Sequence, residues 1–311
     1  MRTKLFIVSD SPRPNLALAK ISESCRSIYD VELAPSMDWA LAVKKNNPST
    51  MIFASWIFKR EDGANMEGGP ASKRPGLALP KLYETCYPDW SHWPQMKGGT
   101  MGYLTRGCPR KCPWCVVSTN EGDATRQVAE VADILRRERY LSIMDANLLA
   151  LPDRAGLARI LADLAATRAH VNFKQGLDCR FIDEDIASAL ARIRVKQYQI
   201  ACDTDAMLPY AETAIRHIWR AKRTANVSCY VFVDWRNPGW LESAIKRIDT
   251  LAAVDHMVNF EADGVHRFVP FVMLWDIENA PQKARDLQRW ANRRELFCSI
   301  PFNEYKPRKD I

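Results

Sequence analysis

No apolar run in this sequence approaches the ~18 residues that a membrane-spanning helix needs, and the N-terminus shows no secretory pattern. The chain also lacks a second C-x2-C pair and any H-x3-H pair, so the ligand spacing of a common zinc site is missing. The missing apolar run and secretory pattern argue against a membrane contact and predict that the protein is cytoplasmic. In the cytoplasm, cysteine thiols stay reduced. A disulfide framework, which stabilises small secreted chains, does not suit a chain of 311 residues.

A strong charge imbalance is also missing, because the formal net charge is only +7. This modestly basic balance permits contact with a phosphate backbone without requiring it. The ten tryptophans are numerous for this length, and several stand beside basic residues, as Trp235 does beside Arg236 and Trp290 beside Arg289. Such pairs suit stacking on nucleic-acid bases and anchoring in a core alike.

Three of the nine cysteines stand close together in residues 107–115, at the spacing C-x3-C-x2-C. The apolar stretch 101–105 before them predicts a strand, and the glycine, prolines and basic residues among them predict a loop. Thiolates are the ligands that iron–sulfur clusters require. Three protein ligands on a four-iron cluster would leave one iron open to a substrate or cofactor. An incomplete zinc site and a chance grouping of thiols are the alternatives.

This run resembles the cluster-binding loop of the radical S-adenosylmethionine (SAM) superfamily, C-x3-C-x-aromatic-C, with Trp114 in the aromatic position. The resemblance implies that Cys108, Cys112 and Cys115 hold a [4Fe–4S] cluster whose fourth iron is chelated by SAM. It further implies reductive cleavage of SAM to a 5′-deoxyadenosyl radical that abstracts hydrogen from a substrate, with a flavodoxin- or ferredoxin-type electron donor. It does not separate a mutase or isomerase from an oxidoreductase or transferase.

From residue 101 onwards, predicted strands and helices alternate. Strands are expected at 101–106, 140–145, 170–174, 197–202, 228–233 and 269–274, and helices at 124–138, 154–167, 183–192, 207–222, 239–251 and 280–293. This count matches the partial (βα)6 TIM-like barrel of the radical SAM family, which we place at 101–300. A last strand is expected at 296–300, a further strand is possible at 256–260, and 301–311 would form a basic C-terminal tail.

The N-terminal residues 1–60 predict a small βαβαβ Rossmann-like domain, so the fold class is α/β throughout. In position this domain resembles the cobalamin-binding domain that precedes some radical SAM barrels. The loop after its first strand begins with Asp10 but lacks the His and Gly of the cobalamin motif D-x-H-x-x-G, so we expect a degenerate scaffold without cobalamin. Residues 61–100, rich in loops and aromatics and containing Lys73 and Arg74, are expected to pack on the barrel as a linker.

Polar residues just past the carboxyl ends of barrel strands face the site in this class of fold. The rule selects Asp145, Asn147, Gln175, Asp178, Arg180 and Asp203. Under the family resemblance, Asp145 or Asn147 would accept hydrogen bonds from the SAM amino group, Arg180 would pair with its carboxylate and Asp203 would bind its ribose hydroxyls. Each of these residues can equally be a helix N-cap or a turn residue.

The segments L-T-R-G-C-P-R-K-C-P-W-C, M-D-A-N, K-Q-G-L-D-C-R and L-Q-R-W-A-N resemble radical SAM proteins of phages and mobile elements. Some of these are linked to hypermodification of pyrimidine bases in DNA, which implies a base or nucleoside substrate. Basic residues near the C-terminus, among them Arg289, Arg293 and Arg308, would then contact phosphates, although a solvated helix face explains them as well. A radical SAM enzyme for a small metabolite or peptide, and a non-catalytic iron–sulfur or nucleic-acid-binding module, remain alternatives.

Overall fold

The computed structural model describes residues 2–55, 57, 59–68, 71–73, 79 and 81–306. The chain forms two compact units, Met1–Ile160 and Leu161–Ile311, with the boundary inside helix α6 (Arg154–Ala166). Each unit mixes helices with parallel strands, which confirms the α/β class. The predicted domain limits near residues 60, 100 and 300 stay predictions. Arg74, Arg308 and the end of the basic tail lie outside the described residues.

The first unit begins with a parallel sheet in the order β2-β1-β3-β4. Its elements are β1 (Lys4–Ser9), α1 (Leu16–Cys25), β2 (Asp30–Leu33), α2 (Met37–Asn46), β3 (Met51–Ser55) and β4 (Met66–Gly68). The central strand β1 is buried along its middle because both of its faces are covered, as its continuous apolar run predicts. The alternation of strand and helix expected for this part of the chain is present.

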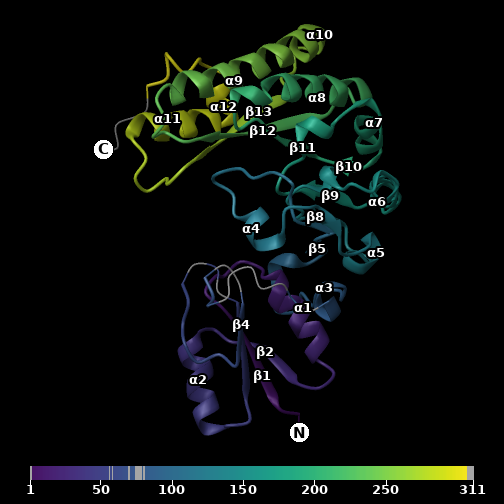
Figure 1. The fold of residues 1–311 in the computed structure, drawn as a ribbon, viewed down its shortest axis with the longest axis vertical. Coiled ribbons are helices and arrows are strands. Elements are labelled where there is room, and N and C mark those ends of the chain that lie inside the picture. The colour runs from purple at the N-terminus through teal and green to yellow at the C-terminus, as the bar shows by residue number, and fades with distance from the viewer. Residues whose placement is uncertain are drawn as a thin grey trace. The chain divides into compact units, whose positions relative to one another are not determined.

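The two helices of this layer pack on opposite faces of the sheet (Figure 1). Phe6 packs with Met37 of α2 on one face, and Ile7 packs with Leu18 of α1 on the other. This division follows from the strand period of two, which points neighbouring side chains to opposite faces. Asn15 and Ser36 cap the two helices through their side-chain oxygens.

The remainder of the first unit supports the cysteine loop. Its elements are α3 (Lys81–Glu84), a 3₁₀ turn (Pro94–Met96), β5 (Gly99–Gly102), β6 (Thr105–Arg106), α4 (Val117–Glu121), β7 (Arg126–Gln127), α5 (Val131–Ile134), β8 (Tyr140–Ile143) and a 3₁₀ turn (Leu148–Ala150). Strand β5 pairs parallel with β8, and β6 pairs antiparallel with β7. The predicted helix 124–138 is wrong: its first residues are extended beside β6, with Val128 N donating to Leu104 O, and only α5 is helical.

The second unit contains the parallel pair β9 (His170–Phe173) and β10 (Arg194–Val195), and the parallel sheet β11 (Gln197–Ala201), β12 (Asn226–Val233) and β13 (Phe268–Leu274). Its helices are α7 (Glu184–Arg192), α8 (Leu208–Ala221), α9 (Trp240–Asp255), α10 (Glu261–Asp263), α11 (Gln282–Ala291) and α12 (Arg294–Phe297). Short 3₁₀ turns occur at Cys179–Phe181 and Asp205–Met207. The strands from 197 onwards fall within a residue or two of the predicted ones.

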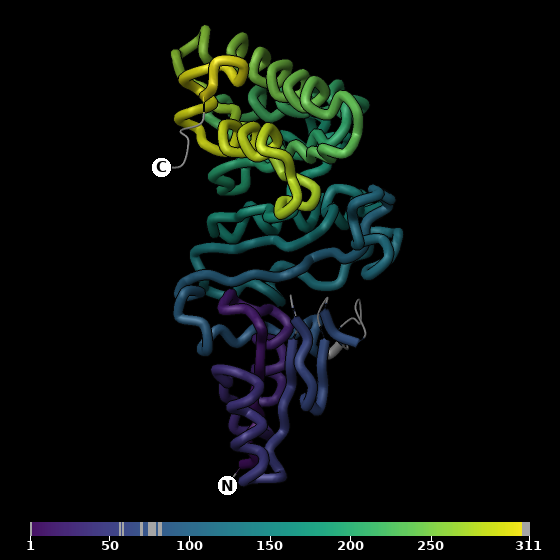
Figure 2. Tube along the Cα trace, turned by 90° about the vertical axis from the view of Figure 1, so that its left-hand side faces the viewer, coloured from purple at the N-terminus to yellow at the C-terminus, as the bar shows by residue number. Residues whose placement is uncertain are grey.

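Helices cover one face of the β11–β12–β13 sheet, where α8, α9 and α11 lie together (Figure 1). Figure 2 shows α9 and α11, green to yellow, from the side. Side chains that point toward these helices, such as Cys229, Val231 and Val272, are buried. The opposite face is partly exposed, and Phe271 keeps 43 % of its surface accessible. The sheet therefore presents one packed face and one face with accessible aromatic side chains.

Neither the possible strand at 256–260 nor the predicted strand at 296–300 is present in the structure. Residues His256–Phe260 continue α9 as a π-helical turn, in which Asn259 donates to the Asp255 carboxylate. The strand predicted at 296–300 is wrong, because α12 occupies Arg294–Phe297 and Trp290 Nε1 donates to Ile300 O just beyond it. Among the described helices, none is long and apolar enough to cross a membrane.

Candidate functional site

The loop with the three cysteines is closed at its base by main-chain contacts. Gly107 begins it with φ of +85°, and a Cβ at this position would lie 2.2 Å from Ala124 O, so only glycine fits. Gly107 N donates to a Glu121 carboxylate oxygen at 3.2 Å, and Cys108 N donates to Gly122 O at 3.1 Å. The segment before the cysteines is thus fixed to the segment after them.

The three thiols differ in exposure. Cys108 is buried, Cys112 is half-buried and Cys115 is exposed. The Cys108 sulfur accepts hydrogen bonds from Asn147 Nδ2 at 3.6 Å and from Arg110 N at 3.5 Å. The thiolate is the form of a cysteine that binds metal.

The donor set fits an iron–sulfur cluster in its chemistry, because three cysteines share one short closed loop and one sulfur already receives two N–H donors. The thiols are not gathered around one point: over the described part of the chain, no group of three His, Cys, Asp or Glu side chains is arranged to hold a metal ion. Cys115 is exposed and Trp114 is half-buried.

Asp145 follows β8 and is only 3 % exposed. Its carboxylate accepts hydrogen bonds from Leu104 N at 2.9 Å, Thr105 N at 2.6 Å and Thr105 Oγ1 at 2.6 Å. Burial raises the pKa of Asp145 to about 6, although these hydrogen bonds act to lower it. Asp145 therefore fixes the backbone just ahead of the cysteine loop, while Asn147, two residues later, contacts the Cys108 sulfur directly.

In the second unit, Asp178 and Arg180 pair with each other. Arg180 Nε and Nη2 donate to the two Asp178 oxygens at 2.7 and 3.0 Å, and Asp178 also caps the following 3₁₀ turn by accepting from Arg180 N. The N-cap alternative is thus what the structure shows for Asp178. Gln175 is exposed in the turn after β9.

Asp203 lies at the carboxyl end of β11, where one of its oxygens accepts from Phe232 N at 3.0 Å. Burial raises the pKa of Asp203. Beside it, Arg247 of α9 is only 3 % exposed and donates to Cys202 O at 2.7 Å and Phe232 O at 3.3 Å. The sequence prediction missed Arg247, although a basic residue on the apolar stripe of an otherwise regular helix was a usable signal.

Three further cysteines, Cys179, Cys202 and Cys229, are buried in the second unit. Burial raises the pKa of Cys179 and of Cys202 to about 12, and that of Cys229 well above its ordinary value. These thiols therefore stay protonated and act as core residues. Cys86 and Cys298, by contrast, are half-buried and exposed.

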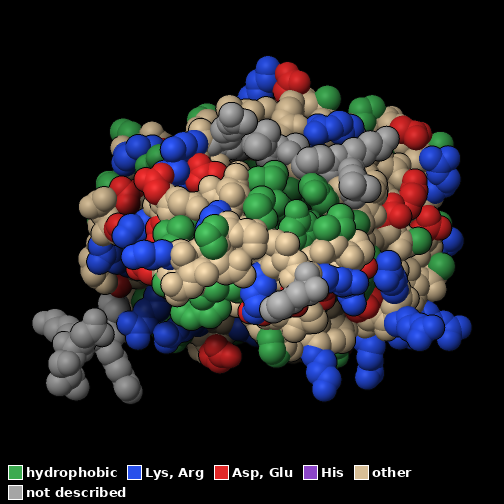
Figure 3. Space-filling model, turned by 90° about the horizontal axis from the view of Figure 1, so that it is seen from below, with side chains coloured by type: hydrophobic (Ala, Val, Ile, Leu, Met, Phe, Trp, Pro, Cys, Tyr) green, Lys and Arg blue, Asp and Glu red, His purple; other side chains and the backbone are tan. Residues whose placement is uncertain are grey.

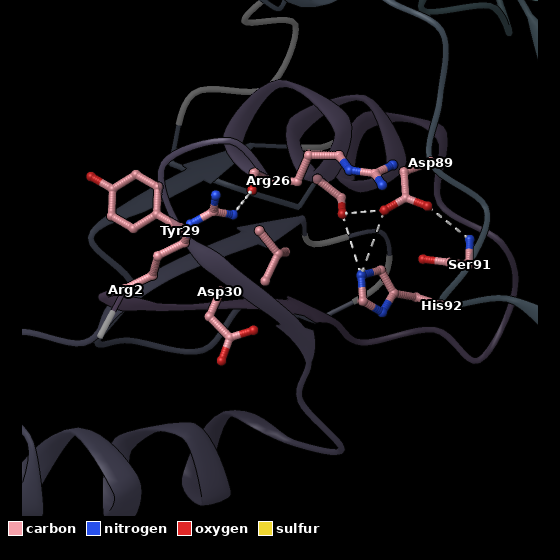
Figure 4. A pocket seen from close by; sticks show the side chains of 9 residues that line it. Arg2, Arg26, Tyr29, Asp30, Asp89, Ser91 and His92 are labelled. Carbon is pink, nitrogen blue, oxygen red and sulfur yellow. Dashed lines mark hydrogen bonds and ion pairs between the residues drawn. The ribbon is translucent and has the colours of Figure 1, made fainter.

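An open hollow of about 400 Å³ in the first unit lies beside α1 and contains none of the predicted site residues (Figure 4). Ser22 Oγ donates to Asp89 at 2.8 Å and lies 3.3 Å from His92 Nε2. Because the serine is fully buried and bonds the aspartate directly, this group is not the arrangement of a hydrolytic triad. It fastens the segment around residue 89 to α1.

Neither a model of a known protein family nor a curated protein matches the chain.

Proposed function

We propose that the chain is a radical SAM enzyme whose cluster is held by Cys108, Cys112 and Cys115. The observation that carries the proposal is the cysteine loop itself: three thiols at C-x3-C-x2-C in a loop whose base is closed and whose first sulfur accepts two N–H donors. When bound, a [4Fe–4S] cluster with SAM supplies one-electron cleavage of SAM to a 5′-deoxyadenosyl radical.

The residues around the loop have separate tasks in this proposal. Asn147 and the Arg110 amide, which donate to the Cys108 sulfur, would stabilise the negative charge of that sulfur as a cluster ligand. Asp145 holds Leu104 and Thr105, so its contribution to SAM binding would be indirect. Trp114, which takes the aromatic position of the motif, would contribute to cofactor binding.

In this proposal the parallel strands from β5 to β13 would form the partial (βα)6 barrel, and β1 to β3 with their helices would form the Rossmann-like domain. Gln175, Asp178, Arg180 and Asp203 would then face SAM from the strand ends, with Arg180 directed to the carboxylate and Asp203 to the ribose. The partly exposed Arg180 side chain, whose partner Asp178 is buried, and the half-buried Asp203 are compatible with these roles.

The absence of cobalamin is part of the proposal as well. The two Asp10 oxygens accept hydrogen bonds from Ile57 N and Lys59 N at 2.7 and 2.6 Å. Through Asp10, the loop after β1 is thus tied to the backbone that follows β3. An electron donor of flavodoxin or ferredoxin type, acting in the cytoplasm, would supply the reducing electron.

A nucleic-acid base or nucleoside is the substrate class that we favour. Helix α11 and the residues after it expose Lys283, Arg289 and Arg293, which suit phosphate contacts. On the face shown in Figure 3, Lys and Arg side chains are interspersed with Asp and Glu. A small metabolite or peptide is the alternative substrate, and its binding would not require these basic residues.

The test is anaerobic reconstitution with ferrous iron and sulfide, followed by SAM cleavage under reductant. The parent chain should bind about four irons, and Ala at any of Cys108, Cys112 or Cys115 should remove most of the iron and all SAM cleavage. Cys25→Ala and Cys86→Ala are matched controls, since both cysteines lie outside the loop, and should leave the iron content intact. A triple Ala variant that keeps its iron and its SAM cleavage would overturn the proposal.

A further inference from the structure

A chain of charged side chains runs from helix α1 to both ends of the cysteine loop. Lys20 of α1 donates to Glu84 O and lies 4.0 Å from the Glu84 carboxylate. Arg106 of β6 contacts Glu84 at 3.1 Å through Nη2 and Glu121 of α4 at 2.9 Å through Nη1. Four charges of alternating sign therefore connect elements far apart in the sequence.

This chain of charges is not an ordinary surface arrangement. The Lys20 side chain is only 1 % exposed and projects from the buried side of α1, so its charge depends on Glu84. Burial lowers the pKa of Lys20. The Arg106 guanidinium lies 3.4 Å from the centre of the Tyr103 ring, which holds the side chain in one orientation while its two ends bind different carboxylates.

Arg106 and Glu121 lie on the two sides of the cysteine loop in the sequence. Arg106 immediately precedes the cysteine loop, and Glu121 closes the short helix that follows it. The second Glu121 oxygen accepts the Gly107 amide, so one carboxylate receives both the guanidinium and the first amide of the loop. Fixing Glu121 therefore fixes both ends of the loop together.

We infer that Arg106 is a positioning residue for the cysteine loop, held in place by Glu84 and Lys20 of the preceding elements. Through this link, the N-terminal layer orders the loop without contacting the thiols. The inference concerns the order of the loop in the protein alone, and it rests on the proposed function only for the identity of what the thiols bind.

Arg126 provides a matched control within the same ladder. It is the strand partner of Arg106 in the β6–β7 pair, but it is exposed and donates to the Glu121 main-chain oxygen at 2.7 Å. Arg126→Gln therefore removes one guanidinium from the same two-stranded pair without touching the carboxylate that closes the loop.

The first measurement is amide hydrogen exchange in the iron-free chain. In Arg106→Gln, the amides of Gly107 and Cys108 should exchange about tenfold or more faster, because a charge-assisted contact that closes the loop is lost. Arg126→Gln should leave both rates within about twofold of the parent. Arg106→Lys keeps the charge but cannot reach both carboxylates with a rigid fork, so its rates should fall between parent and Gln variant. This variant also replaces the Gln variant if the latter does not fold.

Equal exchange rates in Arg106→Gln and Arg126→Gln, or an Arg106→Lys variant that exchanges as fast as Arg106→Gln, would overturn the inference.

The second measurement is reconstitution of the full chain with ferrous iron and sulfide. Arg106→Gln should bind less iron and give a reduced-cluster EPR spectrum of altered line shape, while Arg126→Gln matches the parent. If the parent itself takes up no iron but the exchange difference is present, the proposed function fails and the positioning role stands. If the parent takes up iron and both variants exchange and bind iron as it does, the positioning role alone fails.

Discussion

Replacing Gly107 by alanine tests the closure of the cysteine loop most directly. The added Cβ would stand 2.2 Å from Ala124 O, and reaching an ordinary contact of 3.4 Å requires that oxygen to retreat by about 1.2 Å. A shift of that size removes the hydrogen bonds from Gly107 N to Glu121 and from Cys108 N to Gly122 O, each worth about 1 kcal/mol. The left-handed φ of +85° adds about 1–2 kcal/mol of backbone strain.

We therefore expect Gly107→Ala to lower the free energy of unfolding by about 3–4 kcal/mol. The control is Gly98→Ala, which has a similar φ of +76° in the same unit but would bring its Cβ within 4 Å of no described atom. It should cost only the strain, about 1–2 kcal/mol. Urea unfolding of the iron-free proteins, followed by far-UV circular dichroism, measures both. Equal losses in the two variants would refute the close approach of Gly107 to Ala124 as the reason for glycine here.

Three further predictions concern other parts of the chain. The folded pKa of Asp145, about 6, lies above its ordinary value of 3.8. The stability that Asp145 contributes is therefore complete below about pH 4, and it declines by about 3 kcal/mol as the pH rises to about 6 and beyond. Urea unfolding of Asp145→Asn should lack this decline, and a pH profile identical to that of the parent would contradict the prediction. Charge reversal at Arg289 and Arg293 should weaken DNA binding and reduce the slope of log affinity against log salt by about 2; fluorescence anisotropy between about 50 and 200 mM salt measures this, and an unchanged slope would count against phosphate contacts by α11. Arg247→Met should lower the free energy of unfolding by about 2–4 kcal/mol, because two strand-end carbonyls lose a buried charged donor. Lys246→Met, at the exposed neighbouring position, should lower it by well under about 1 kcal/mol. Urea unfolding measures both, and equal losses would be inconsistent with this role of Arg247.

The alternation of strands and helices was predictable wherever hydrophobic periodicity decides the element. Strand β1 carries a continuous apolar run because both of its faces are buried. Strand β12 is also largely apolar, and the side chains on its helix-covered face are buried. Residues 124–138 show why the prediction failed elsewhere. Their composition permits a helix, but Val128 pairs with Leu104 and the cysteine loop must return to β6, so tertiary contacts outweigh local propensity.

The candidate site was predictable in its cysteines and only partly in its surroundings. The spacing of Cys108, Cys112 and Cys115 is visible in the sequence. The rule that polar residues past the carboxyl ends of strands face the site selected Asn147, which contacts the Cys108 sulfur in the structure. The same logic selected Asp145 as a ligand-facing residue, whereas its carboxylate is directed to backbone amides. The role of Arg106 in joining two distant carboxylates was not predictable, because no local pattern records which charges meet in space.

The closure of the cysteine loop bears on the order of events while the chain is being made. The contacts that close and brace the loop involve residues up to Asn147, and the second unit begins only at Leu161. N-terminal parts of a chain fold first during synthesis, and closing a short loop has a low entropic cost, which rises by only about 0.6 kcal/mol for each doubling of its length. A nascent chain thus carries the complete loop, together with Lys20 and Glu84, before any residue of the second unit has been added. If the thiols hold the proposed cluster, its loading would be able to begin while the second half of the protein is still on the ribosome.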